Sequence, residues 1–157
     1  MGVVTMVAEV GFPYPPEKVY DFVTNPANWV KTYPGSEHEE GLPQNTALDC
    51  GDTWVETGPN DAKYHWQVGV AVRPKLWTCH TVGNLGYKDG QAGSGTPGQI
   101  RMQYRFKPYG ENFTVFERTY LTESYPGTDL SDIFLTSMNP KHAETYFAGI
   151  ARELAKG

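Results

Sequence analysis

Between Ser36 and Thr122 the chain runs through short segments in which apolar and polar residues alternate, separated by Gly, Pro and Asn turn signals. A period of two is typical of strands with one buried face, and repeated short strands predict an antiparallel sheet. The strands expected in this part of the chain cover residues 36–40, 53–57, 64–72, 76–82, 100–106 and 113–121. An apolar run over residues 3–12 adds a first strand, so we expect a sheet of about seven strands.

Two short helices are expected directly after the first strand. A proline cluster ends that strand, because proline cannot continue a ladder of backbone hydrogen bonds. From Pro15 the apolar residues Val19, Phe22 and Val23 follow helical spacing. Another proline then opens a second short helix over residues 27–31.

A longer helix is predicted at the C-terminal end. Asn139 is a suitable N-cap, and Pro140 fits the first helical position. The apolar residues that follow recur at helical spacing: Ala143, Phe147, Ile150, Ala151 and Leu154. The preceding segment, residues 130–138, fits either one helical turn or an ordered loop. Roughly 17 helical residues span about 25 Å, so we expect an α+β fold in which a curved sheet buries its apolar face against this helix.

Length and charge narrow the class of protein. The 157 residues suit a single domain over residues 1–157, and the net charge of −5 offers no basic surface to a phosphate backbone. Nucleic acid is therefore not an expected partner. No apolar run reaches the roughly 20 residues of a membrane span. The first residues lack the features of a secretory signal and two cysteines make no disulfide framework, so a cytoplasmic protein is predicted.

No motif points to a metal or a cofactor. Cys50 and Cys79 lack zinc-site spacing, and the consecutive polar residues 37–40 alternate between strand faces. The Gly-rich segment 83–98 lacks both the Walker pattern and a helix directly behind it. We therefore expect neither a cofactor nor a metal site.

The segment PPEKVYDFVTNPANWVKTYPG, residues 15–35, resembles the opening of the START-like SRPBCC superfamily, and the rest of the chain agrees with that superfamily in element order and length. The resemblance implies a helix-grip fold with an elongated cavity between the curved sheet and the long helix. It does not imply one activity, because members include polyketide cyclases, hydrolases, lyases, ligand carriers and chaperone-associated modules.

Three residues are candidate catalytic groups: His80, Arg118 and Tyr104. His80 is expected on the inward face of its strand, where it could remove a proton next to a carbonyl. Arg118 is expected to face the cavity with Glu56 as its partner, and to clamp a carboxylate or stabilise an enolate or phenolate. In the other register Arg118 lies on the sheet surface beside Glu117 or Glu123.

The remaining candidates are expected to form the substrate-binding wall of the cavity, although each also fits ordinary core packing. They are Tyr120, Phe116, Trp66, Trp29, Tyr33, Met102, Phe106 and Phe147. His38 and His142 are expected to be solvated. Tyr125, Asp129 and Asp132 are expected at the cavity rim, with Asp129 also suited to a helix cap.

These residues favour a small cofactor-independent enzyme of the polyketide cyclase/dehydrase or lyase type, which performs acid/base chemistry on an aromatic or polyketide-like substrate. The alternative is a carrier of a hydrophobic lipid or aromatic ligand without turnover. A protein-interaction module would instead have a filled core and an exposed apolar patch. A homodimer is compatible with either of the first two hypotheses.

Overall fold

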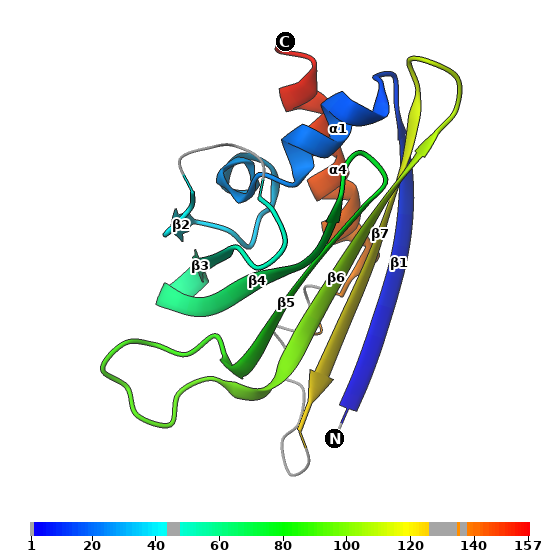
Figure 1. Ribbon diagram of the computed structural model, residues 1–157. Helices are drawn as coiled ribbons and strands as arrows, with labels where there is room; N and C mark the ends of the chain where they lie inside the picture. The colour runs from blue at the N-terminus through cyan, green and yellow to red at the C-terminus, as the bar shows by residue number, and fades with distance from the viewer. Residues whose placement is uncertain (1, 44–47, 126–134, 136–137) are drawn as a thin grey trace.

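The computed structural model describes residues 2–43, 48–125, 135 and 138–157. Seven strands form one antiparallel sheet: β1 (Gly2–Phe12), β2 (His38–Glu40), β3 (Thr53–Gly58), β4 (Ala62–Val72), β5 (Leu76–Leu85), β6 (Thr96–Pro108) and β7 (Thr114–Ser124). Their order across the sheet is β1-β7-β6-β5-β4-β3-β2. The long strands curve in space, as Figure 1 shows. The expected curved sheet of about seven strands is confirmed.

The helices occur where the proline and capping signals predict them. They are α1 (Pro16–Val23), the 3-10 turn η1 (Pro26–Asn28), α2 (Trp29–Thr32) and α4 (Pro140–Leu154), with a second 3-10 turn, η2 (Pro59–Asp61), between β3 and β4. The Asn139 side chain accepts a hydrogen bond from the Lys141 backbone N–H at 3.0 Å, which caps α4. Most of segment 130–138 lies outside the described residues.

The core lies between the inner face of the sheet and the helices α1 and α4, which lie on the same side of the sheet in Figure 1. Tyr20 of α1 packs edge-on against Phe106 of β6, with ring centroids 5.0 Å apart. Phe147 of α4 packs in the same manner against Phe116 of β7, at 5.8 Å. Aromatic side chains therefore attach both helices to the sheet.

The second half of β4 differs from the sequence prediction. The even-numbered residues from Tyr64 to Val72 are expected to share one apolar face, yet Val70 and Val72 are 38% and 50% exposed. The pairing of β4 with β5 shifts register between Val68 and Val70. A bulge inserts one residue and thereby exchanges the two faces of the strand beyond it.

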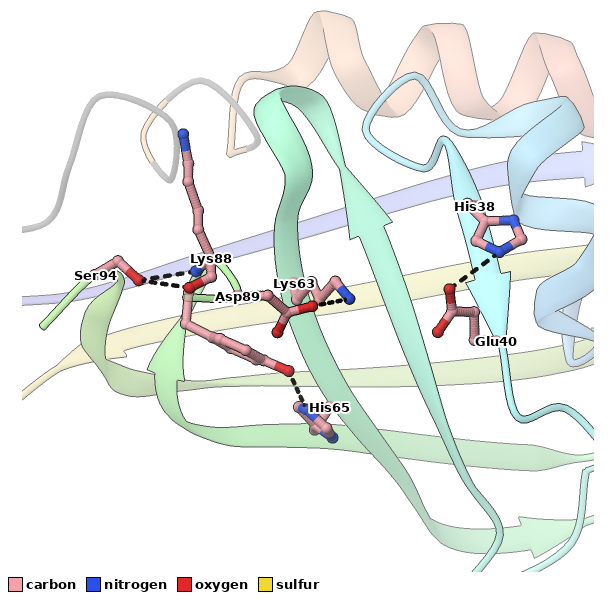
Figure 2. A network of polar contacts seen from close by, with 8 residues as sticks. His38, Glu40, Lys63, His65, Lys88, Asp89 and Ser94 are labelled. Atoms are coloured by element: carbon pink, nitrogen blue, oxygen red, sulfur yellow. Dashed lines mark hydrogen bonds and ion pairs between the residues drawn. The ribbon is translucent and has the colours of Figure 1, made fainter. Parts of the chain in front are cut away.

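Only the middle of the Gly-rich segment 83–98 forms a loop, because β5 continues to Leu85 and β6 begins at Thr96. Side chains of β4 hold this loop, as Figure 2 shows for Lys63 and His65. Lys63 Nζ lies 2.5 Å from Asp89 Oδ2, and His65 Nε2 lies 2.6 Å from the Tyr87 hydroxyl. The loop is thus attached to the strand that borders it.

Helices α2 and α4 approach each other closely at Gly149. A Cβ atom at this position would lie 2.8 Å from the backbone oxygen of Thr32 and 3.0 Å from its Cα. Real Cβ contacts are essentially never shorter than 3.0 Å, so a larger residue would push the two helices apart.

We expect Gly149→Ala to lower the free energy of unfolding, although alanine favours a helix by about 1 kcal/mol over glycine. Overpacking costs about 1–3 kcal/mol, so the net loss should be about 1 kcal/mol and at most about 2 kcal/mol. Urea unfolding measures it. Ala148→Gly, at an exposed position of the same helix, is the control for helix propensity. A Gly149→Ala protein as stable as the parent would contradict this packing.

Candidate functional site

A cavity of about 330 Å³ lies between the inner face of the sheet, the α2 region and α4. Its lining is mainly aromatic, and includes Trp29, Tyr33, Tyr64, Trp66, Tyr104, Tyr120 and Tyr146. An acidic and a basic side chain lie in the same lining: Glu56 of β3 and Arg118 of β7. Such a cavity, apolar with few converging polar groups, is the usual form of a small-molecule site.

Arg118 projects inward because of the alternation of β7. Every second residue from Thr114 to Ser124 is buried, and Arg118 lies on this face with 2% of its surface exposed. Its cross-strand partner in β6 is Tyr104, which is also buried. The register that places Arg118 on the sheet surface is therefore wrong, and Glu117 on the other face pairs with Lys107 instead.

The Arg118 guanidinium is only partly satisfied by hydrogen bonds. Nη2 contacts the Met102 Sδ at 3.4 Å, whereas buried Nε and Nη1 have no hydrogen-bond partner among the described residues. The rings of Tyr33, Tyr120 and Tyr146 surround the guanidinium, with Cζ at 5.4, 4.8 and 5.1 Å from their centroids. These contacts are attractive but leave the positive charge without a counter-charge.

Glu56 of β3 is held in the cavity lining by two hydrogen bonds. The Ser36 hydroxyl donates to its Oε2 at 2.5 Å, and the Trp66 indole N–H donates to its Oε1 at 3.3 Å. Burial raises the pKa of Glu56 to about 7, against the lowering effects of these two hydrogen bonds and of the Arg118 charge. A carboxyl group with a pKa near neutrality can both accept and donate a proton at physiological pH.

The expected ion pair between Arg118 and Glu56 does not form. In the described part of the chain, no carboxylate oxygen hydrogen-bonds to the Arg118 guanidinium. Glu56 instead takes its hydrogen bonds from Ser36 and Trp66. The cavity therefore keeps an uncompensated positive charge whenever Glu56 is protonated.

A second carboxyl group, Glu39 of β2, is the cross-strand neighbour of Glu56. Both of its carboxyl oxygens are buried, and neither has a hydrogen-bond partner among the described residues. Burial, followed by repulsion from Glu56, raises the pKa of Glu39. Two neighbouring buried carboxyl groups cannot both ionise cheaply, so the pair favours its protonated forms.

The tyrosine hydroxyls add neutral hydrogen-bond donors. The Tyr104 and Tyr146 hydroxyl oxygens are 3.4 Å apart. Burial raises the pKa of both hydroxyls, that of Tyr146 to about 12. They are thus O–H donors at neutral pH, and they lie in the lining that also contains Arg118.

The structure places seven of the predicted site residues in this lining: Arg118, Tyr104, Tyr120, Trp66, Trp29, Tyr33 and Met102. Three further residues are expected at the cavity rim. Tyr125 is exposed, and Asp129 and Asp132 lie outside the described residues.

The inward placement of His80 is wrong. Along β5 the buried residues are Trp77, Cys79 and Thr81, so His80 lies on the opposite face of the sheet. There it borders a separate surface hollow together with Arg101 and Gln103. Burying the large Trp77 ring decides which face turns inward, and His80 cannot reach the cavity.

Three of the expected wall residues belong to the core and not to the cavity lining: Phe106, Phe116 and Phe147. Phe116 is fully buried, and the other two rings pack against it at 5.4 and 5.8 Å. Mutual packing of these rings fills the end of the interior next to α1, so no space remains there for a ligand.

Sequence reasoning missed two lining residues on α4. Tyr146 is spaced by three residues from Ala143 and by four from Ile150, so helical periodicity contains the signal for its burial. His142, expected in solvent, is half-buried and contributes to the lining. His38 is exposed as expected, beside Glu40 (Figure 2).

The chain matches no protein-family model and no curated protein sequence. Its fold is similar to that of Ara h 8.0201, at 12% identity and TM-score 0.68, over 99% of this chain and 100% of the other. It is also similar to norcoclaurine synthase from Thalictrum flavum in complex with dopamine and hydroxybenzaldehyde, at 12% identity and TM-score 0.67, over 99% and 88% of the two chains. Protein MLL2253 from Mesorhizobium loti is 12% identical, with TM-score 0.67 and 98% of both chains covered.

These similarities confirm the expected helix-grip fold, a curved antiparallel sheet with a long C-terminal helix. The fold includes a synthase, so it is compatible with catalysis as well as with ligand binding. At this level of identity the fold is shared and the activity is open. No helix in the described ranges is long and apolar enough to cross a membrane.

We expect folding stability to fall as the pH rises from 4.5 through 7. The pKa of Glu56 is raised from 4.5 to about 7 on folding, so its contribution is fully present below pH 4.5 and is lost above pH 7. Glu56→Gln cannot ionise and should flatten this decline by a few kcal/mol. Glu39 should leave a residual slope, because its pKa is also raised.

Urea unfolding at pH 5, 6, 7 and 8 tests this. Glu117→Gln is the matched control, because Glu117 pairs with Lys107 on the outer face and its pKa is lowered. Equal slopes for Glu56→Gln and the parent protein would show that Glu56 ionises normally.

Proposed function

We propose that this protein is a small cofactor-independent enzyme of the cyclase, dehydratase or lyase type, which transfers a proton to or from an aromatic carbonyl compound held in the cavity. One observation carries the proposal: Glu56, a buried carboxyl group whose pKa is raised by burial, and Arg118, a buried guanidinium with two unpartnered nitrogens, lie in the lining of the same aromatic cavity. Groups with shifted pKa values that converge on a cavity are typical of catalytic sites.

Glu56 takes the part of general base that His80 cannot take. In its ionised form it removes a proton from the carbon next to a carbonyl group, and in its protonated form it returns a proton to the product. The hydrogen bonds from Ser36 and Trp66 fix the carboxyl group in place, so that little reorganisation is needed for the transfer.

Removing this proton creates negative charge on the carbonyl oxygen, as an enolate. Arg118, with Tyr104 and Tyr146, provides donors within the same water-poor cavity, where such donors stabilise a developing oxyanion most strongly. The aromatic walls formed by Trp29, Trp66 and Tyr120 suit a planar substrate. The similar norcoclaurine synthase structure contains two aromatic compounds, dopamine and hydroxybenzaldehyde, which supports an aromatic substrate by analogy.

A carrier of aromatic ligands is the second candidate. It is favoured by the predominance of neutral aromatic rings in the lining, which bind a planar ligand without any proton transfer. Turnover separates the two candidates, because a carrier binds its ligand and leaves every C–H bond intact.

We expect the protein to catalyse exchange of the α-protons of aryl ketones and aryl-acetaldehydes in D2O, measured by loss of the α-proton NMR signal. Glu56→Gln should lower the exchange rate about 10²–10⁴-fold, the usual contribution of a general base. Glu117→Gln, on the outer face, should retain the full rate.

Full activity in Glu56→Gln would exclude Glu56 as the base. Binding of these compounds in a thermal-shift assay without exchange in the parent protein would instead establish the carrier function.

A further inference from the structure

We propose that the ligand of this cavity is an aromatic monocarboxylate, whose carboxylate group binds to Arg118 and whose rings lie against the aromatic walls. The inference rests on the proposed function only in that both use the same cavity. The proposed ligand carries a permanent negative charge, whereas the proposed mechanism requires only the transient charge of an enolate.

No carboxylate of the described residues is hydrogen-bonded to Arg118. The side chain is 2% exposed, and its Nε and Nη1 atoms find no acceptor in the described part of the chain. A buried charge without partner is costly, and arginine cannot relieve the cost by releasing its proton. A ligand carboxylate in the cavity that Arg118 lines would supply the missing negative charge.

The acids of β7 and the acid of the cavity lining have other hydrogen-bond partners, and Glu39 is not among the lining residues. Glu117 and Glu123 face outward and bond to Lys107 and Gln99 respectively. Glu56 lies in the lining but accepts from Ser36 and Trp66, and burial favours its neutral form. These acids thus leave Arg118 without a hydrogen-bonded carboxylate, the partner that an anionic ligand in the cavity would provide.

The tyrosines around Arg118 do not replace that anion. Tyr33, Tyr120 and Tyr146 present ring faces within 5.4 Å of the guanidinium carbon. Ring faces hold the guanidinium in a fixed position, but they carry no net charge, and burial raises the pKa of the Tyr33 and Tyr146 hydroxyls. The result is a preorganised cationic centre at an aromatic wall.

The charge and size of the cavity set the limits of the ligand. Arg118 is the one Lys or Arg residue of the described lining, which matches a single negative charge and disfavours a phosphate dianion. A volume of about 330 Å³ lies within the usual range for small-molecule pockets and accommodates one or two aromatic rings. An amine placed beside Arg118 would be repelled by the guanidinium.

The test compares naphthalene-2-carboxylate with its neutral isostere naphthalene-2-carboxamide by isothermal titration calorimetry. The parent protein should bind the carboxylate at least 10-fold more tightly than the amide. Arg118→Met should reduce this ratio to about one, and Arg118→Lys should restore part of it. Arg101→Met removes an exposed arginine from the outer sheet face and should leave the ratio unchanged.

Arg118→Met should fold, because it replaces an uncompensated buried charge by an apolar side chain of similar length, and circular dichroism checks this. The inference is overturned if the parent protein binds acid and amide equally, or if the acid fails to bind at millimolar concentration. It is also overturned if Arg118→Met keeps the parent ratio, or if Arg118→Lys has the same ratio as Arg118→Met. Naphthyl phosphate binding more tightly than the carboxylate would also overturn it.

The outcome is independent of the proposed catalysis. The two proposals have separate readouts in the parent protein, the acid-to-amide affinity ratio and the rate of α-proton exchange. If the parent protein prefers the carboxylate but catalyses no exchange, only the proposed enzyme activity is rejected. If it catalyses exchange without preferring the carboxylate, only the proposed carboxylate ligand is rejected.

Discussion

Packing of aromatic rings between the curved sheet and α4 is the interaction on which the other features depend. Phe116 is fully buried at its centre and contacts Phe12, Tyr104, Phe106 and Phe147. Each large ring removes roughly 150–250 Å² of surface from water, so these contacts contribute a large part of the apolar burial of the interior. They also fill the interior beside α1 and leave the open volume next to Arg118 and Glu56.

This apolar surrounding acts on the two buried ionisable groups in different ways. Glu56 can respond by binding a proton, and burial raises its pKa to about 7. Arg118 keeps its charge because a guanidinium does not deprotonate in proteins. The same low-polarity environment therefore produces a titratable acid and a permanent cation in one cavity, which is the basis of both the proposed proton transfer and the proposed carboxylate ligand.

The candidate site could be predicted in part, and His80 and Arg118 show where the limit lies. Alternation indicates which residues of a strand share a face, but it does not say which face turns inward. In β7 the aromatic neighbours of Arg118 gave the correct choice, whereas in β5 the set around His80 looked as apolar as the buried set with Trp77. In β4 a bulge exchanges the inward and outward faces within one strand, and no local sequence pattern indicates this bulge.

The sequence by itself determined the order and type of the elements, because proline positions, capping residues and hydrophobic period act over a few neighbouring residues. It also determined that a curved sheet would enclose an aromatic interior against one long helix. The tertiary structure alone decided which polar groups share the cavity. Glu56, Arg118 and Tyr146 belong to three elements far apart in the chain, and their juxtaposition depends on strand register and on the seating of α4. Those are properties of long-range packing, which no local pattern of residues encodes.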